Sequence, residues 1–235
     1  MCGRITQKSN PKVLGLKIAT LVEPLFEAPP RYNGAPSQEH WVIRQHPETG
    51  VRTLDRLTWG LIPGWIKEAS PKVKPINATA ERVATAPMFR RAYAKRRCLL
   101  PVDSFFEWKA IKGVRAKQPH AIGMRSGEPF ALAAIWEGWR NPESGEVLRT
   151  FCVITTEANE LVADIHNRMP VILPSEVYDR WLSTIEPDPH DLLVPYPAEL
   201  MMMWPISTRV NKPENNEPGI LERWEPVSGV TPSLL

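Results

Sequence analysis

The sequence has little cysteine, no long apolar run and no strong excess of one charge. The three cysteines, Cys2, Cys98 and Cys152, show no CxxC spacing, which argues against a disulfide framework or a structural zinc site. No segment approaches the roughly 20 apolar residues of a membrane-spanning helix, and no basic segment followed by an apolar run opens the chain. We therefore expect a cytoplasmic, nucleoid-associated protein without a metal, cofactor or membrane partner.

Length and composition favour one domain. The 235 residues are enough for one substantial core, and the net charge of +3 permits an acidic partner without requiring one. The 25 prolines and nine tryptophans are the unusual counts. Prolines indicate long ordered loops and short regular elements. So many indoles indicate either a large aromatic core or surfaces that stack on flat ligands.

The residue pattern predicts an α+β fold, with a curled, barrel-like, mainly antiparallel sheet flanked by short helices in a single domain. Residues 40–46 and 51–61 are expected to pair as a hairpin, and residues 11–22 and 88–97 to form helices. Short turns separate four further strands, and sheets of this kind curl because strands twist. These strands are predicted at 98–109, 119–125, 129–139 and 147–156.

The first residues offer unusual chemistry. Removal of Met1 would place a free α-amine and a thiol together on Cys2. Both groups have a nucleophilic fraction near neutral pH in reference peptides. With an aldehyde the amine forms an imine and the thiol closes a five-membered thiazolidine ring. An inert, buried cysteine is the alternative interpretation.

Three polar residues are candidates for proton transfer or orientation. Glu107, between aromatic residues, is either a partly desolvated acid or a strand-end carboxylate that faces water. His166 lies in a loop and is either a proton shuttle or a surface histidine. Asn77 either orients an amine or a sugar hydroxyl, or caps a turn or helix. Arg4 and Arg168 could each bind a phosphate or form a surface ion pair.

Seven segments, in order along the chain, closely resemble the SRAP family, the SOS-response-associated peptidases that crosslink to abasic sites in single-stranded DNA. The similarity covers roughly residues 2–210, and we expect residues 211–235 to form a partly ordered tail. The segments are Met1–Arg4, Arg31–Pro36, Trp59–Pro63, Ile76–Ala78, Arg97–Pro101, Phe105–Trp108 and His166–Pro170.

The resemblance implies a role for individual residues. Cys2 matches the N-terminal nucleophile, Asn77 the residue that holds the reacting end, Glu107 the acid/base, and His166 the histidine that assists ring chemistry. Arg4 and Arg168 match positions that hold backbone phosphates. The implied activity is covalent capture of abasic sites by a monomer, with self-processing peptidase and lyase activities attached to the same site.

A positively lined cleft with stacking indoles is how single strands are gripped without reading sequence. Trp65 is the candidate stacking platform, with a buried core tryptophan as the alternative. Arg90–Arg97 holds five cations, although such a run is usually a solvated helix face.

Three positions depart from the usual family pattern. Thr79 stands where arginine is usual, so Arg82 is expected to supply that phosphate contact. Phe106 replaces a tyrosine, and Asn167 replaces an aspartate that often follows the histidine. None of these changes falls on the four expected catalytic residues.

Three other functions compete with crosslinking. An N-terminal-nucleophile amidohydrolase also begins Met-Cys-Gly, and Asn33-Gly34 would then supply the oxyanion donors. A non-catalytic single-strand-binding module would use residues 90–97 and the tryptophans. A cysteine peptidase is the third, interpreted as self-directed activity limited to exposing Cys2.

Overall fold

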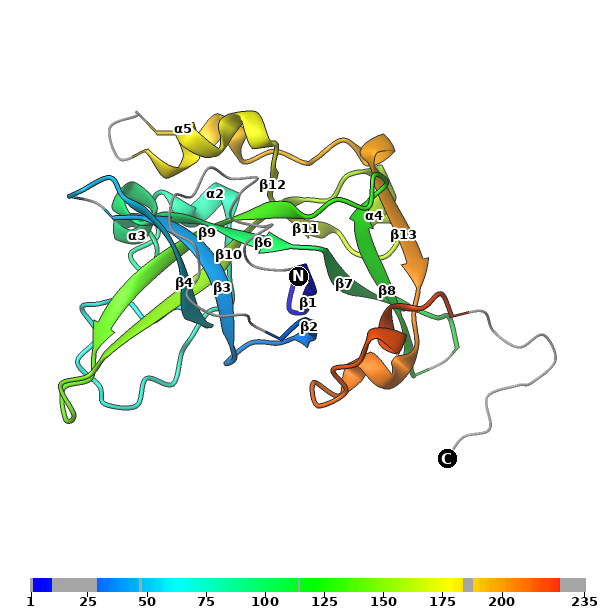
Figure 1. The fold of residues 1–235 in the computed structure, drawn as a ribbon, viewed down its shortest axis with the longest axis horizontal. Coiled ribbons are helices and arrows are strands. Elements are labelled where there is room, and N and C mark those ends of the chain that lie inside the picture. The colour runs from blue at the N-terminus through cyan, green and yellow to red at the C-terminus, as the bar shows by residue number, and fades with distance from the viewer. Residues whose placement is uncertain (1, 10–28, 47, 114, 184–187, 225–235) are drawn as a thin grey trace.

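The computed structural model describes residues 2–9, 29–46, 48–113, 115–183 and 188–224. The helix expected at 11–22 lies outside these residues. Two sheets form the molecule, with short helices at the periphery (Figure 1). Within the described ranges, no helix is long and apolar enough to span a membrane.

The larger sheet contains a closed five-stranded barrel. Its strands follow the order β10-β4-β3-β6-β9, and β9 also pairs with β10, which closes the ring. All contacts in the ring are antiparallel except β10 with β4. The barrel strands are β3 (Glu39–Gln45), β4 (Arg52–Trp59), β6 (Arg97–Val102), β9 (Phe130–Arg140) and β10 (Val147–Glu157).

Three short strands extend this sheet. One of them, β5, runs parallel to β10, and the others run antiparallel to β10 and β9. They are β5 (Asn77–Thr79), β11 (Arg168–Pro170) and β12 (Ile172–Leu173).

The smaller sheet is antiparallel and has the order β13-β8-β7-β1-β2. The N-terminal strand β1 is therefore an inner strand, held on both edges. The strands are β1 (Ile5–Gln7), β2 (Arg31–Gly34), β7 (Ser104–Ala110), β8 (Lys117–Met124) and β13 (Met201–Pro205).

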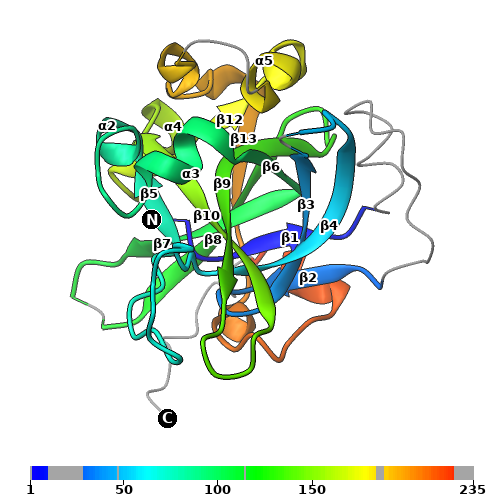
Figure 2. The same ribbon diagram turned by 90° about the vertical axis from the view of Figure 1, so that its left-hand side faces the viewer.

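Helices are short and lie outside the sheets. In Figure 2, α2, α3 and α4 gather on one side of the barrel and α5 lies above it. The α-helices are α2 (Ala80–Val83), α3 (Arg90–Lys95), α4 (Glu160–Ala163) and α5 (Tyr178–Leu182). The 3₁₀ helices are η1 (Ser175–Val177), η2 (His190–Leu192), η3 (Ala198–Leu200), η4 (Thr208–Asn211) and η5 (Pro218–Leu221).

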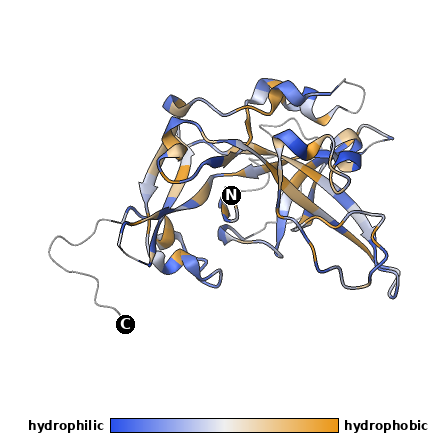
Figure 3. Ribbon diagram, turned by 180° about the vertical axis from the view of Figure 1, so that it is seen from behind, coloured by the Kyte–Doolittle hydropathy of each residue, from blue (hydrophilic) through white to orange (hydrophobic). Residues whose placement is uncertain are grey.

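The core follows from alternation along the barrel strands. Side chains at every second position point inward and are buried, as period-2 strands require. Figure 3 shows the apolar residues concentrated on the strands, with hydrophilic residues toward loops and helices. The inward-facing residues include Val42, Leu57, Leu100, Leu132 and Phe151.

The predicted fold class is confirmed: short helices surround a curled, mainly antiparallel sheet in one domain. The predicted hairpin is β3 with β4, in register from Glu39↔Thr58 to Gln45↔Arg52. One strand prediction was wrong, because residues 98–109 form two strands in different sheets. Asp103 separates them: its carboxylate accepts hydrogen bonds from the backbone amides of Lys8 and Ser9 at 2.7 and 2.9 Å.

The basic helix is shorter than predicted. It ends at Lys95, and Arg97 is the first residue of β6. The Arg97 guanidinium is buried and donates to the carbonyls of Tyr93 and Trp181. Arg97 therefore holds α3 and α5 on the barrel and does not belong to the exposed cationic face.

Gly34 is placed where two sheets approach each other. A Cβ at this position would lie 2.5 Å from Cε1 of His40. The His40 ring is fixed by edge contacts with Trp59 and Phe151 and by an Nε2–H bond to the Ala35 carbonyl. The His40 ring therefore has little room to move away from a Cβ added at position 34.

We expect Gly34→Ala to lower the free energy of unfolding by about 1 to 3 kcal/mol, because overpacking forces strain into the surroundings. Urea unfolding followed by tryptophan fluorescence measures it. Gly219→Ala is the control, since nothing lies within 4 Å of its added Cβ. Equal unfolding midpoints for the two variants would contradict the prediction.

Candidate active site

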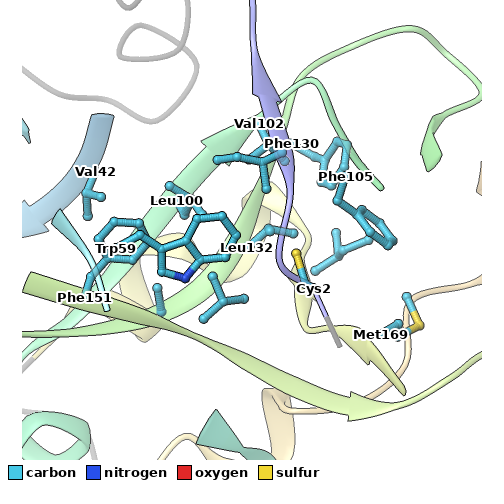
Figure 4. Close-up of a cluster of buried hydrophobic side chains, with 14 of the residues drawn as sticks. Cys2, Val42, Trp59, Leu100, Val102, Phe105, Phe130, Leu132, Phe151 and Met169 are labelled. Carbon is cyan, nitrogen blue, oxygen red and sulfur yellow. The ribbon is translucent and has the colours of Figure 1, made fainter. Parts of the chain in front are cut away.

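Cys2 lies at the centre of the molecule, just before β1. Its side chain is fully buried, among a cluster that includes Phe105 and Met169 (Figure 4). Burial raises the pKa of the Cys2 thiol far above its usual range, and the Glu107 carboxylate raises it further, against an opposing bond from the Arg4 backbone amide. The thiol is therefore held in its protonated form.

Asn77 makes direct contact with the Cys2 residue. It is the first residue of β5, and the pairing Val153↔Asn77 fixes its backbone against β10. Its Nδ2 donates to the Cys2 carbonyl at 2.8 Å. Its Oδ1 is buried and has no hydrogen-bond partner among the described residues. Asn77 thus lies on a strand and is not the cap of α2, which is Thr79, and it keeps an acceptor beside the Cys2 backbone.

Glu107 is a buried acid. It lies on β7, two residues after Phe105, and only 3% of its surface is exposed. The alternative of a carboxylate facing water is therefore excluded. Burial raises the pKa of Glu107, and electrostatic interactions with His166 and Lys117 oppose this rise. Glu107 interacts electrostatically with both the Cys2 thiol and His166, so these three groups lie close to one another.

His166 lies in the loop between α4 and β11, as predicted, and is partly buried. Its Nδ1 accepts a hydrogen bond from the Arg168 backbone amide at 2.9 Å. Because Nδ1 is the acceptor, the proton of the neutral ring is on Nε2. His166 therefore presents an N–H donor, and not a lone pair, at its outer nitrogen.

A surface hollow of about 370 Å³ leads to Asn77, and we call it the Asn77 hollow. Trp65 and Arg82 line it together with Thr79 and an apolar wall, so three of the eight candidate residues meet here. Trp65 is 45% exposed, which excludes a buried core role. The lining residues are Trp65, Asn77, Thr79, Arg82, Ala86, Pro87, Met88 and Phe89.

Arg4 is engaged within the protein. Its Nη1 donates to Asn33 Oδ1 at 2.7 Å and to the Val210 carbonyl at 2.5 Å, and the guanidinium lies 5.8 Å from the centre of the Trp108 ring. Asn33 is fully buried, and its Nδ2 donates to carbonyls of the segment 210–215. Both residues thus attach this C-terminal segment to the small sheet. Asn33 is not available as an oxyanion donor, so the structure gives the amidohydrolase interpretation no support.

Arg168 is the first residue of β11 and forms an ion pair, one of the two alternatives for this residue, with a partner that the sequence did not indicate. Its Nη1 lies 2.7 Å from Glu81 Oε1, and Nη2 lies 3.0 Å from Oε2. Glu81 follows Asn77 by four residues, in the first turn of α2. The only sequence signal was an acid near a helix start, which is too common to single out.

A larger hollow of about 640 Å³ lies elsewhere, between the β8–β9 turn and the start of η1. None of the eight candidate residues lines it. Within the described part of the chain, no three His, Cys, Asp or Glu side chains are arranged to hold a metal ion.

Comparison with known proteins finds relatives over most of the chain. The SOS response associated peptidase (SRAP) family matches residues 1–213. The abasic site processing protein YoqW of Bacillus subtilis is 40% identical over 226 residues, which cover 94% of this chain and 99% of YoqW. The abasic site processing protein HMCES of Gallus gallus is 30% identical over 224 residues, covering 82% of this chain and 66% of HMCES.

Solved structures show the same fold. A crystal structure of a protein from Bacteroides thetaiotaomicron superposes with a TM-score of 0.83 at 25% identity, covering 95% of this chain and all of the other. A protein from Bordetella bronchiseptica gives 0.74 at 28% identity over 88% of this chain. The sequence match and the shared fold span nearly the whole domain, and the chain belongs to the SRAP family.

Proposed function

We propose that this protein captures abasic sites in single-stranded DNA by forming a thiazolidine between Cys2 and the aldehyde of the opened sugar. The observation that carries this proposal is the position of Asn77. Asn77 is one of the residues that line the surface hollow, and its side chain bonds to the Cys2 backbone. It therefore connects a surface suited to a nucleotide with the buried residue that performs the chemistry.

The Asn77 hollow suits an unpaired, base-free nucleotide. Arg82 offers a cation for a phosphate, and the exposed Trp65 offers a face on which a neighbouring base can stack. An abasic site has no base to be excluded, so the bare sugar can approach Asn77. The relatives named for abasic site processing support this choice of substrate.

The buried thiol favours attack by the amine first. After removal of Met1 the Cys2 amine adds to the aldehyde carbon, and loss of one water gives an imine. Glu107 in its protonated form, which burial favours by raising its pKa, supplies the proton that leaves with the hydroxyl group. The Nε2–H of His166 stabilises the developing negative charge on oxygen.

Ring closure uses the thiol. The sulfur bonds to the imine carbon, the carbon–nitrogen double bond becomes single, and the thiol proton is transferred to nitrogen through the Glu107 carboxylate. The high pKa of the thiol keeps this proton in place until the imine forms. Asn77 Oδ1, beside the Cys2 backbone, accepts from the amine and orients it. The net change is protein plus aldehyde to thiazolidine plus water.

Intact mass spectrometry tests the proposal. Protein confirmed to lack Met1 is incubated with a single strand that carries one abasic site. We expect a product equal to protein plus DNA minus one water. Undamaged DNA, and protein that retains Met1 and hence an acylated Cys2 amine, should give none. No adduct from the processed protein on abasic DNA would overturn the proposed function.

A further inference from the structure

The ion pair between Glu81 and Arg168 is built more tightly than an ordinary surface pair. Both carboxylate oxygens meet both terminal nitrogens of the guanidinium, at 2.7 and 3.0 Å. Arg168 Nη2 also donates to the Thr155 carbonyl at 2.7 Å. Such fork-to-fork geometry fixes orientation as well as distance.

The pair joins two segments that carry site residues. Thr155 of β10 pairs with Thr79 of β5 on one edge and with Pro170 of β11 on the other. Glu81 follows β5, which begins with Asn77, and Arg168 begins β11, just after His166. The ion pair therefore crosses the end of β10 and ties the Asn77 segment to the His166 segment.

Arg168 acts directly on the His166 ring through its backbone. Its N–H donates to His166 Nδ1 and so keeps the ring proton on Nε2. The Arg168 Nε is buried and has no hydrogen-bond partner within the described ranges. The contacts with Glu81 and Thr155 are therefore the ones that hold this guanidinium in place.

Glu81 is held in its ionised form, as an ion pair with Arg168 requires. A hydrogen bond from Arg168 is the main cause that lowers the pKa of Glu81 to about 2, and the Thr79 hydroxyl adds a second bond. Residue 79 is an uncharged threonine, so Arg168 is the cation with which Glu81 pairs. The bidentate geometry fixes the direction of the Arg168 side chain, which points to orientation as the role of the pair.

We propose that Glu81 is a positioning residue for the crosslinking reaction: through Arg168 it holds the His166 ring in the orientation and tautomer that the Cys2 site uses. This inference rests on the proposed function. Loss of the pair frees the Arg168 backbone to shift, and the donor at His166 Nε2 then meets the reacting oxygen less often. Arg82, the cation that lines the Asn77 hollow, is not part of this pair, so we expect DNA binding to be unaffected.

The test is single-turnover crosslinking with protein lacking Met1 in excess over abasic DNA. The dependence on protein concentration gives a maximal rate constant and a half-saturating concentration. For Glu81→Gln we expect the maximal rate constant to fall on the order of tenfold, because small misplacements are costly. The half-saturating concentration should stay within about twofold.

Glu157→Gln is the matched control. Glu157 lies directly opposite Arg168 in the β10–β11 pairing and is exposed, so the variant removes an equal charge without removing the ion pair. Both constants should equal those of the wild type. Thr79→Val is a milder second variant, expected to slow the maximal rate about two- to threefold by loosening Glu81.

Nitrogen-15 NMR of the histidine rings gives a readout independent of crosslinking. The wild type should show His166 with the proton on Nε2, and Glu81→Gln a mixture of tautomers. An unchanged tautomer and rate constant would overturn the inference. An unchanged rate constant with tighter DNA binding would also overturn it, because Glu81 would then only compete with phosphate. If the wild type forms no adduct, the proposed function fails and the NMR comparison still decides the positioning role.

Discussion

Cys2→Ser, processed to remove Met1, is expected to form no adduct that survives denaturation. Serine keeps the α-amine and replaces the thiol by a hydroxyl of similar shape. The imine can still form, but the hydroxyl is a far weaker nucleophile toward it, so the linkage hydrolyses back. We expect borohydride, which reduces imines, to trap a stable product with Cys2→Ser, and intact mass to identify it.

Two comparisons make this result specific. Acetylation of the α-amine should abolish both the stable and the borohydride-trapped products. A stable adduct from Cys2→Ser without borohydride would mean that the thiol closes no ring and that the amine alone is responsible. Because the Cys2 side chain is fully buried, its substitution can affect folding, so the melting curve of the variant is measured as well.

Glu107→Gln should slow crosslinking about a hundredfold, because it removes the buried acid that gives and takes protons in both steps. The rate of the wild type should decline as pH rises through the raised pKa of Glu107, since only the protonated acid can assist loss of water. Glu107→Gln should lack this decline. Quenched single-turnover reactions between pH 5 and 9 measure both profiles.

The same substitution should not destabilise the protein. The pKa of Glu107 is higher in the folded than in the unfolded chain, so its contribution to stability is present at low pH and is lost as pH rises through the folded value. The glutamine side chain of the variant carries no charge at any pH. Urea unfolding at pH 8 should therefore find the variant at least as stable as the wild type. If the variant were less stable than the wild type, its lost activity would have to be attributed to misfolding.

Local pattern was a good guide to the individual strands. The β3–β4 hairpin and the strands β8 and β9 follow from alternation and turn residues, which act over a few positions. The division at Asp103 was not predictable in this way. It depends on the Lys8 and Ser9 amides, more than 90 residues away in the sequence. The parallel contacts of β10 with β4 and β5 are likewise set by tertiary structure.

The site was recognised from ordered segments and not from any single residue. Family resemblance placed Cys2, Asn77, Glu107 and His166, and the structure brings Asn77 to the Cys2 backbone. Asn33 was missed as a structural residue, because an Asn-Gly pair indicates a turn. Its three carbonyl partners lie in the segment 210–215, which local pattern does not associate with it.

The inner position of β1 has a mechanical consequence. Cys2 lies three residues before a strand that is hydrogen-bonded to β2 on one edge and to β7 on the other. A pull on DNA linked to Cys2 would act on the end of this strand. The hydrogen bonds to β2 and to β7 would then be loaded in shear at the same time, and they would not break one after another. A motor protein that meets the adduct would have to tear the middle of a sheet before it could unravel the protein from the DNA.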